Sequence, residues 1–450
     1  MVIVFILAVL AAFGALHWYA WARLFRATTR GPGLVRRVGA VVVGGGPLLV
    51  FAALAAERGG APFPLQQVLA WPGFLWLALS LYLLLALVAG ELVRPVLYRL
   101  LKRRSGGETV VLEEAAVSRE AAPSVTSASS VSSALSAQKT EGRTVPAGAG
   151  PGGGPAPEAE PAPEAESASS DPASSDVSRR LFVSRTIAGA AAAVAVGTVG
   201  YGTHGVLRGP RVKRVTVPLA KLPRAAHGFR IAVVSDVHLG PVLGRGFAQK
   251  VVDTINSTQP DLIAVVGDLV DGSVKDLGPA AAPLAGLKAK HGAFFVTGNH
   301  EYFSGAEQWV EHVRELGLNP LENDRTELPY FDLAGVNDVA GEDEGSGPDF
   351  AKALGDRDRA RASVLLAHQP IVIHDAVRHG VDLQLSGHTH GGQLWPGNFV
   401  ADLANPTLAG LERYGDTQLY VSRGAGAWGP PVRVGAPSDI TVVELASRKA

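Results

Sequence analysis

The sequence predicts an α/β domain of the layered α/β/α type, preceded by an all-α transmembrane region and a disordered linker. Two patterns in the C-terminal half predict the domain. Short apolar runs rich in β-branched residues alternate with segments whose apolar residues recur three and four positions apart, which indicates strands alternating with amphipathic helices. The strand-like runs are almost uninterrupted by polar residues, so we expect helices to cover both faces of the sheet.

The predicted strands lie at 229–235, 261–267, 293–298, 363–367 and 382–387. Segments 245–257 and 306–316 have the spacing of helices that pack on a sheet. We therefore assign residues 208–450 to one folded domain.

Three apolar segments near the N-terminus are each about long enough to cross roughly 30 Å of hydrocarbon. They are Val2–Arg23, Gly39–Ala56 and Val68–Ala89, within a region that we place at 1–104. Arginines are concentrated after the first and third segments, whereas the loop between the second and third carries only Arg58. The positive-inside rule then places the arginine clusters in the cytoplasm and the N-terminus outside. A soluble helical bundle, the alternative, would need polar faces that these segments lack.

Residues 105–180 are rich in Ala, Ser, Pro, Gly and Glu and contain few large apolar side chains. Such a composition buries too little apolar surface to offset chain entropy, so it predicts a disordered linker. Residues 181–207 follow as a second hydrophobic region. The arginine pair in SRRLFV, ahead of a weakly apolar run, fits a twin-arginine signal anchor, and a fourth ordinary span is the alternative. Both readings send residues 208–450 outward across the cytoplasmic membrane of a multi-pass protein.

Charge and composition exclude some classes of function. Acidic and basic residues balance at 41 each, so no net charge favours nucleic acid as a partner. The chain has no cysteine, which excludes disulfides, thiolate metal ligands and a cysteine nucleophile. A metal would have to be bound by His, Asp, Glu or Asn.

Polar side chains follow each predicted strand directly. The five segments read SDVH, GDLVD, GNHE, AHQP and GHTH, and they supply Asp236, His238, Asp268, Asp271, Asn299, His300, Glu301, His368, His388 and His390. In open α/β sheets the ligand site lies beyond the carboxyl ends of the strands, so these groups should meet at one rim. Isolated histidines are more often ordinary surface or core residues, and we read His17, His204, His227, His291, His312, His374 and His379 in that way.

The combination of imidazole, carboxylate and amide donors without sulfur suits manganese, iron or zinc. One ion cannot use so many donors. Two divalent ions about 3.5 to 4 Å apart, joined by a shared carboxylate, would use them all.

These motifs, in this order, resemble the calcineurin-like metallophosphoesterases, and SDVHLG, VTGNHEYF and LQLSGHTHGGQLWP are similar to a membrane-anchored bacterial branch of predicted phosphohydrolases. The resemblance covers residues 229–445. It implies a β-sandwich core flanked by helices, with two metal ions. One ion would be bound by Asp236, His238 and His390 and the other by Asn299, His368 and His388, with Asp268 bridging. His300 would act as the catalytic group near the leaving oxygen. Glu301 either orients His300 or caps a turn, and the second role is the plainer expectation.

The resulting hypothesis is a membrane-tethered phosphoesterase that hydrolyses phosphodiester, phosphomonoester or pyrophosphate bonds through a metal-bridging hydroxide. Its expected partners are a phosphoester substrate and the lipid bilayer, and the tether favours a lipid-linked substrate. Loop side chains such as Trp395, Phe399, Trp428 and Arg433 are candidates to shape specificity. The alternative from another class is a non-catalytic metal-binding module of the cell envelope. The sequence leaves the oligomeric state and the native metal open.

Overall fold

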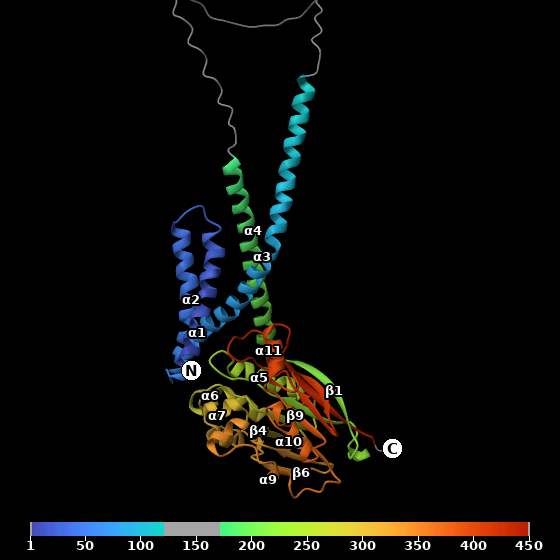
Figure 1. Ribbon diagram of the computed structural model, residues 1–450. Helices are drawn as coiled ribbons and strands as arrows, with labels where there is room; N and C mark the ends of the chain where they lie inside the picture. The colour runs from blue at the N-terminus through green and yellow to red at the C-terminus, as the bar shows by residue number, and fades with distance from the viewer. Residues whose placement is uncertain (1, 121–171, 449–450) are drawn as a thin grey trace, which may run out of the picture. The chain divides into compact units, whose positions relative to one another are not determined.

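The computed structural model describes residues 2–120 and 172–448 (Figure 1). The chain divides into two compact units, one formed by Met1–Leu92 with Ser184–Ala450 and the other by Val93–Val183. The first unit contains most of the apolar helical region and the whole α/β domain.

The N-terminal region is helical, as the sequence predicts. Helix α1 (Val2–Trp21) continues into a π-helical turn at Ala22–Arg26, and α2 (Leu34–Arg58), α3 (Phe63–Glu120) and α4 (Pro172–Leu207) follow. Four segments of the described helices are long and apolar enough to cross a membrane: Leu7–Arg26, Leu34–Arg58, Phe63–Leu101 and Val177–Leu207. These segments overlap the three predicted spans and the fourth hydrophobic region.

Helix occupies both ends of the predicted linker. Helix α3 continues to Glu120 and α4 begins at Pro172, so residues 105–120 and 172–180 are helical. The sequence GETVVLEEAAVSRE at the end of α3 contains strong helix formers such as Leu, Glu and Ala, which explains the extension. Residues 121–171, the centre of the predicted linker, lie outside the described residues.

The α/β domain contains two six-stranded sheets. The first has the order β1-β12-β2-β3-β4-β5, and its strands are β1 (Arg211–Leu219), β12 (Asp439–Ser447), β2 (Phe229–Val234), β3 (Leu262–Val266), β4 (Ala293–Val296) and β5 (Asn319–Pro320). The second has the order β10-β11-β9-β8-β7-β6, with β10 (Gly410–Tyr414), β11 (Thr417–Val421), β9 (Leu383–Ser386), β8 (Ala362–Leu366), β7 (Phe331–Gly335) and β6 (Asp324–Glu327). Strands β2, β3 and β4 are parallel, as are β7, β8, β9 and β11.

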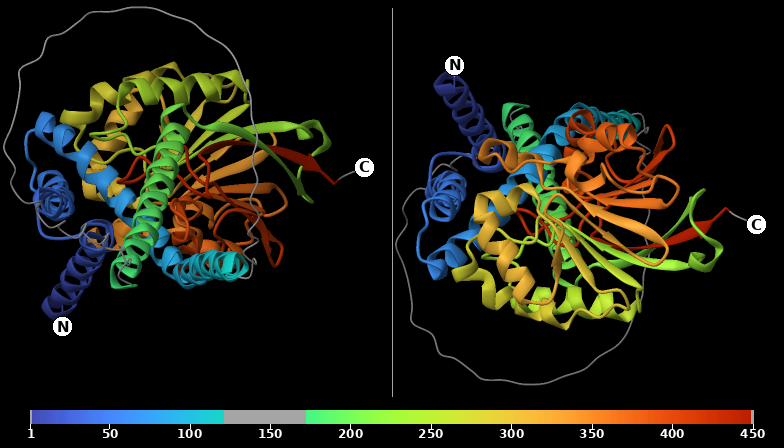
Figure 2. Two further views of the ribbon diagram at one scale, coloured as in Figure 1. Left: turned by 90° about the horizontal axis from the view of Figure 1, so that it is seen from above. Right: turned by 90° about the horizontal axis from the view of Figure 1, so that it is seen from below.

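The sheets stack face to face, with helices on their outer faces (Figure 2). Along β2, Ile231 and Val233 pack between the sheets, while Ala232 and Val234 pack toward the helices. Helices α5 (Arg245–Ser257), α6 (Val274–Ala281), α7 (Asn299–Ser304) and α8 (Ala306–Glu315) follow strands of the first sheet, and α9 (Phe350–Leu354), α10 (Ile373–Arg378) and α11 (Gly397–Ala404) follow strands of the second. Burial of both strand faces explains why the strand sequences are almost continuously apolar.

The predicted elements of this domain are confirmed to within one or two residues at each end, and the layered α/β/α class holds. The structure adds that the central layer consists of two sheets, which the resemblance implied as a β-sandwich core. Short 3-10 turns at Arg224–Ala226, Ala282–Gly286, Val339–Glu344, Pro370–Val372 and His390–Gly392 connect the elements.

Candidate metal centre

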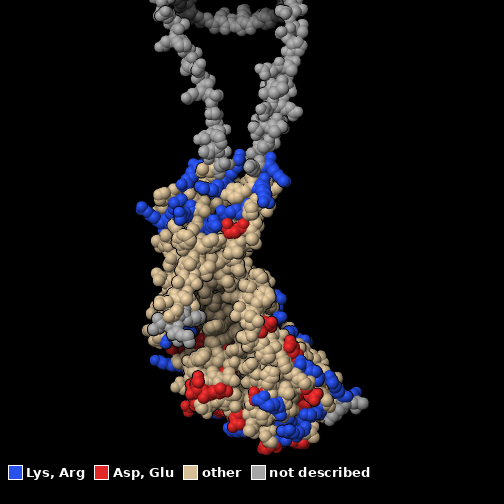
Figure 3. Space-filling view, in the orientation of Figure 1, with Lys and Arg blue, Asp and Glu red and all other residues tan. Residues whose placement is uncertain are grey.

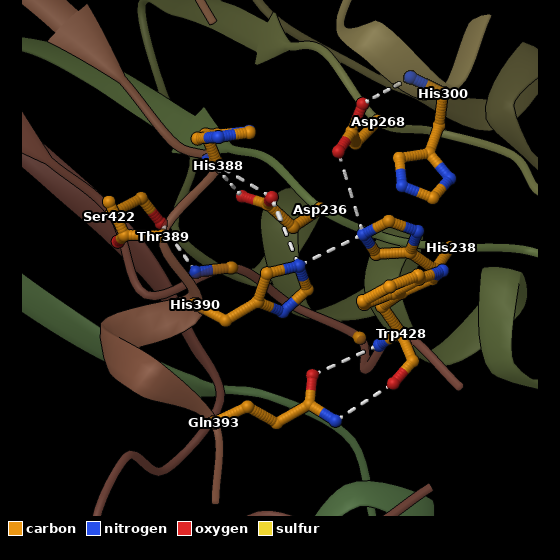
Figure 4. A network of polar contacts seen from close by, with 12 residues as sticks. Asp236, His238, Asp268, His300, His388, Thr389, His390, Gln393, Ser422 and Trp428 are labelled. Atoms are coloured by element: carbon orange, nitrogen blue, oxygen red, sulfur yellow. Dashed lines mark hydrogen bonds and ion pairs between the residues drawn. The ribbon is translucent and has the colours of Figure 1, made fainter. Parts of the chain in front are cut away.

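The carboxyl ends of five parallel strands meet at one rim, and each is followed by polar side chains. Strands β2, β3 and β4 of the first sheet and β8 and β9 of the second end one to two residues before the motifs that the sequence singled out. The two sheets therefore share one site, and Figure 4 shows the side chains from both converging on it.

One group of donors consists of Asp236, His238 and His390, whose candidate donor atoms all lie within 4.8 Å of one another. The Nε2 atoms of His238 and His390 face each other at 3.0 Å, and His390 Nε2 lies 3.3 Å from Asp236 Oδ1. Asp236 is fully buried, and its carboxylate also accepts the main-chain N–H of His388. The same strand-end loops thus hold the carboxylate and both imidazoles.

A second group consists of Asp268, His368 and His388, again within 4.8 Å. Asp268 Oδ2 lies 3.1 Å from His368 Nε2, and the Nδ1–H of His368 donates to the carbonyl of Val266 at 2.9 Å. Although burial opposes a charged ring, the Asp268 carboxylate raises the pKa of His368 well above its ordinary value, so Nε2 also carries a proton and donates it to the carboxylate. Asn299 joins this group, because its Oδ1 lies 3.0 Å from His388 Nδ1.

Asp268 belongs to the second group and also faces the first. Besides its contact with His368, its Oδ2 lies 3.7 Å from His238 Nε2. Its other oxygen accepts the main-chain N–H of His300 at 2.9 Å. A single carboxylate therefore faces imidazoles of both groups.

His300 stands beside these groups and contacts Asp271. Its Nδ1 lies 2.7 Å from Asp271 Oδ1, and the same carboxylate oxygen lies 2.8 Å from His238 Nδ1. Trp428 and Phe303 approach the His300 ring edge-on, at centroid distances of 5.6 and 5.5 Å. Asp271 was part of a motif in the sequence, but nothing in the spacing alone assigned it to orienting two histidines.

Glu301 is fully buried and supports the same loops. Its carboxylate accepts three main-chain N–H groups, from Gly298 at 2.7 Å, Asp268 at 2.9 Å and Leu269 at 2.7 Å. The bond to Gly298 caps the N-terminus of α7, as expected from the sequence. The other two fix the loop that carries Asp268.

Five of the candidate residues adopt left-handed backbone conformations. In the part of the chain that the structure describes, eight non-glycine residues have positive φ, and they include Asp236, His238, Asp268, His388 and His390. Such conformations cost free energy and persist where the surroundings enforce them, most often at functional sites. The strand ends turn sharply here so that consecutive donors point into one space.

Arg433 donates hydrogen bonds to both the side chain and the main chain of His390. It is buried, and its Nη2 donates to His390 Nδ1 at 3.0 Å, while Nη1 donates to the carbonyl oxygens of His390 and Ala436. Its Nε donates to the carbonyl of Gly426 at 2.6 Å. Because guanidinium has only donors, Nδ1 of His390 must accept, so the proton of the neutral ring lies on Nε2, which faces Asp236 and His238. Arg433 thus positions a candidate ligand, whereas the sequence offered it only as a specificity residue.

The buried carboxylates and histidines of the site shift one another's pKa values. Although burial opposes a charged ring, the Asp271 carboxylate raises the pKa of His238 to about 9. Burial and the nearby His368 lower the pKa of His388 to about 4. Burial also disfavours the charged form of Asp268, but His368 and His238 outweigh it and lower the pKa of that carboxyl. Protons on the imidazoles balance the carboxylates, and cations could do the same.

The donor set fits divalent metal ions. It offers imidazole nitrogen, carboxylate oxygen and one amide oxygen within a few ångströms of one another. Second contacts orient two of the imidazoles: Asp271 faces Nδ1 of His238, and the Val266 carbonyl faces Nδ1 of His368. Acceptors behind an imidazole of this kind are typical of metal sites.

Comparison with known proteins agrees with this geometry. Residues 229–392 match the family model described as calcineurin-like phosphoesterase. A Helicobacter pylori protein named as an uncharacterized metallophosphoesterase is 38% identical over 253 residues, which cover 55% of this chain and 68% of that protein. The chain belongs to the calcineurin-like metallophosphoesterases. A Bacillus subtilis metallophosphoesterase is 30% identical over 282 residues, covering 60% of this chain and 98% of that protein.

Some metallophosphoesterase relatives are named as membrane proteins. The zebrafish "transmembrane protein with metallophosphoesterase domain" is 38% identical over 260 residues, which cover 54% of this chain and 59% of that protein. The match thus spans less than two thirds of this relative. The apolar helices of the present chain are consistent with membrane association.

Proposed function

We propose that the protein is a membrane-tethered, metal-dependent phosphoesterase that hydrolyses phosphodiester, phosphomonoester or pyrophosphate bonds at a dinuclear centre. The observation that carries the proposal is the position of Asp268, whose carboxylate faces His238 of one donor group and His368 of the other. A shared carboxylate between two sets of nitrogen and oxygen donors is the arrangement that two-ion hydrolases need.

We assign the donors to two ions as the family resemblance implies. In the proposal, one ion takes Asp236, His238 and His390, the other takes Asn299, His368 and His388, and Asp268 bridges them. The distances support this division, because two of the three close groups found among the described residues contain these same Asp and His residues, and Asn299 contacts His388. The third group joins His238 and Asp268 to His300. Manganese, iron and zinc suit the donors best.

When bound, two such ions would supply Lewis-acid stabilisation of the phosphate oxygens and would lower the pKa of a water molecule toward neutrality. The protein's own residues place the donors and manage a proton. The Nδ1–H of His300 donates to Asp271, which leaves Nε2 for the substrate. Although burial opposes it, Asp271 raises the pKa of His300, so the ring retains the proton that the leaving oxygen requires.

In this proposal the domain faces the extracytoplasmic side of the membrane. Helix α2 begins just after the arginine-rich α1–α2 connection. Near its other end, Ala53 packs with Phe74 of α3 and with Val242 of the α/β domain. Figure 3 shows Lys and Arg side chains gathered at one end of the apolar helices, with the domain at the other. Since positively charged ends stay in the cytoplasm, the domain would face outward from the inner membrane.

The substrate that best fits a domain held at the membrane is a lipid-linked phosphoester. Val242 packs against α2 and α3, and it follows His238 by only four residues. This closeness of the rim to the apolar helices supports a substrate that is itself held in the bilayer.

Hydrolysis of bis-p-nitrophenyl phosphate by the purified full-length chain tests the proposal. The chain would be stripped with a chelator, reloaded with manganese, iron or zinc, and assayed in detergent, with ion content measured on the same samples. We expect turnover that depends on the metal and about two ions per chain. A chain that binds the ions but hydrolyses neither this diester, a phosphomonoester nor a lipid pyrophosphate would be a metal-binding envelope module.

A further inference from the structure

Helix α11 presents an unusual apolar surface to its surroundings. Phe399, Val400 and Leu403 are 61%, 70% and 89% exposed, and none of the residues of this helix is buried. Positions separated by three and four residues lie on one helical face, so these three side chains form a single patch. Half-exposed Trp395, just before the helix, extends it.

The patch is anchored to the metal centre. The first turn of α11 sits on Gly392, where an added Cβ would come within 2.2 Å of Asn398 Cα. Gly392 is two residues from His390, and the next residue, Gln393, holds Trp428 through bonds to its main-chain N–H and carbonyl. Trp428 in turn contacts the His300 ring edge-on, with the ring centroids 5.6 Å apart. Helix α11 therefore lies on the same loops that form the entrance to the site.

The patch also adjoins the candidate spans. Leu394, next to Trp395, packs with Val432 and Val434 in the apolar cluster that contains Leu87 of α3 and Val199 of α4. The main-chain N–H of Trp395 donates to the carbonyl of Val434 at 3.0 Å. The exposed patch thus continues a surface that the apolar helices already cover, and Figure 1 shows α11 on the side of the domain that faces α4.

Helix α4 indicates how deep in the membrane the patch lies. Tyr201 is 76% exposed on this helix, and the next residue, Gly202, contacts Val432 and Arg433. Exposed tyrosine and tryptophan near the end of a span are typical of the membrane–water interface. The loop containing Val432 and Val434 therefore lies at interfacial depth, and Leu394 and Trp395 lie beside it.

We propose that α11 and Trp395 form an interfacial element whose apolar face enters the outer leaflet of the phospholipid bilayer beside the entrance to the metal centre. The occupant of the patch is lipid, because the neighbouring apolar surface belongs to helices that require lipid. The element would deliver membrane-embedded phosphoesters to the site, and this second part rests on the proposed function.

Depth-dependent quenching tests the contact with lipid. Because the chain has no cysteine, a single cysteine at Leu403→Cys or Phe399→Cys can carry an environment-sensitive fluorophore in the full-length protein in phosphatidylcholine–phosphatidylglycerol nanodiscs. Nitroxide groups attached high on the acyl chains should quench these probes several-fold more than a probe at Ala351→Cys. Ala351 is exposed on α9, at the far end of the domain from α11 in Figure 1.

Equal quenching at Leu403 and Ala351 would overturn the proposal. Energy transfer between probes on two copies in the same disc, with no quenching by lipid nitroxides, would assign the patch to a second copy instead. Neither measurement requires catalysis, so the result stands even if the enzyme proposal fails.

A second experiment tests delivery of substrate. The variant Val400→Glu/Leu403→Glu should lower kcat/KM at least tenfold for a phosphatidic acid or lipid pyrophosphate in vesicles, and should leave bis-p-nitrophenyl phosphate turnover unchanged. Equal loss on both substrates would contradict a role in lipid delivery. If neither substrate is hydrolysed by the unmodified chain, the enzyme proposal fails and the quenching result alone decides the membrane contact.

Discussion

The main-chain N–H of Arg433 donates to the carbonyl oxygen of Gly202 at 3.4 Å, so a helix expected to anchor the protein touches the residue that holds His390. The approach is close because Gly202 has no side chain. A Cβ there would lie 2.6 Å from Val432 Cγ1 and 2.9 Å from the carbonyl oxygen of Arg433. Helix α4 is therefore part of the framework of the candidate site as well as a tether.

Replacing Gly202 with Ala should loosen that framework. The added methyl group forces Val432 and Arg433 away from α4, and overpacking of this kind costs about 1 to 3 kcal/mol of stability. We expect weaker retention of the ion bound by His390 and a lower kcat, measured by ion content and turnover of the full-length chain. Gly205→Ala is the matched control, because a Cβ at Gly205 meets nothing within 4 Å. Equal behaviour of the two variants would show that α4 only tethers the domain.

Arg433→Lys should weaken metal binding although the charge is kept. Lysine cannot reproduce the four bonds that the guanidinium makes to His390, Gly426 and Ala436. Loss of a group that orients a metal ligand typically costs about 10- to 100-fold in affinity. Competition with a chelator of known affinity measures the change. The exposed Arg413→Lys serves as control, and an affinity unchanged in Arg433→Lys would remove the positioning role.

Asp268→Ala and Asp236→Ala should differ in stoichiometry. In the proposed assignment Asp268 serves both ions and Asp236 serves one. Elemental analysis should therefore show both ions lost from Asp268→Ala, and about one ion per chain retained by Asp236→Ala. Activity should vanish in both variants, so the ion count is the deciding measurement. Retention of one ion by Asp268→Ala would exclude a bridging carboxylate.

His300 should set the alkaline limit of activity. Although burial opposes it, Asp271 raises the pKa of His300, so the protonated ring persists to higher pH than an ordinary histidine. A proton donor acts only while protonated, so kcat/KM should fall as pH rises through this pKa. Asp271→Asn removes the charge that raises the pKa of His300 and should move the alkaline limb to lower pH, whereas the exposed Asp253→Asn should not.

His300→Ala should lower kcat about 10²- to 10⁴-fold with ion content unchanged.

The sequence predicted the elements and the candidate ligands better than their supports. Strand ends followed by Asp, Asn and His carry a local signal, because parallel strands deliver such residues to one rim. Arg433 lies 43 positions from His390, and no periodicity links two residues that meet only through the tertiary fold. The sequence could not predict the second contact of Asp271, to His300, for the same reason.

In the predicted linker, the sequence-based prediction missed a local feature. Its composition is averaged over many residues, and this average obscured the helix-forming GETVVLEEAAVSRE segment at its start. Single-residue detail at a boundary depends on propensity over one or two turns, which a compositional argument does not resolve.

Glu301→Gln should destabilise the site without removing any proposed ligand. The carboxylate accepts three main-chain N–H groups, whereas glutamine offers one oxygen acceptor and an NH₂ group that would face a donor. Each buried N–H left without an acceptor costs about 1 to 3 kcal/mol. We expect a lower Tm in detergent and weaker ion retention at Asp268, whose loop loses its support. The exposed Glu307→Gln on α8 is the matched control.

The pH dependence of that stability provides an independent check. Burial, with the nearby Asp268 charge, raises the pKa of Glu301 from 4.5 to about 7. A carboxyl whose pKa is higher in the folded state binds its proton more tightly there, so its contribution to stability falls as pH rises from 4.5 to about 7. Glutamine does not titrate, and the metal-stripped Glu301→Gln variant should therefore lose less stability across this interval than the unmodified chain. Identical slopes of Tm against pH in the two proteins would mean that Glu301 is already ionised at low pH, and that its three hydrogen bonds outweigh its burial.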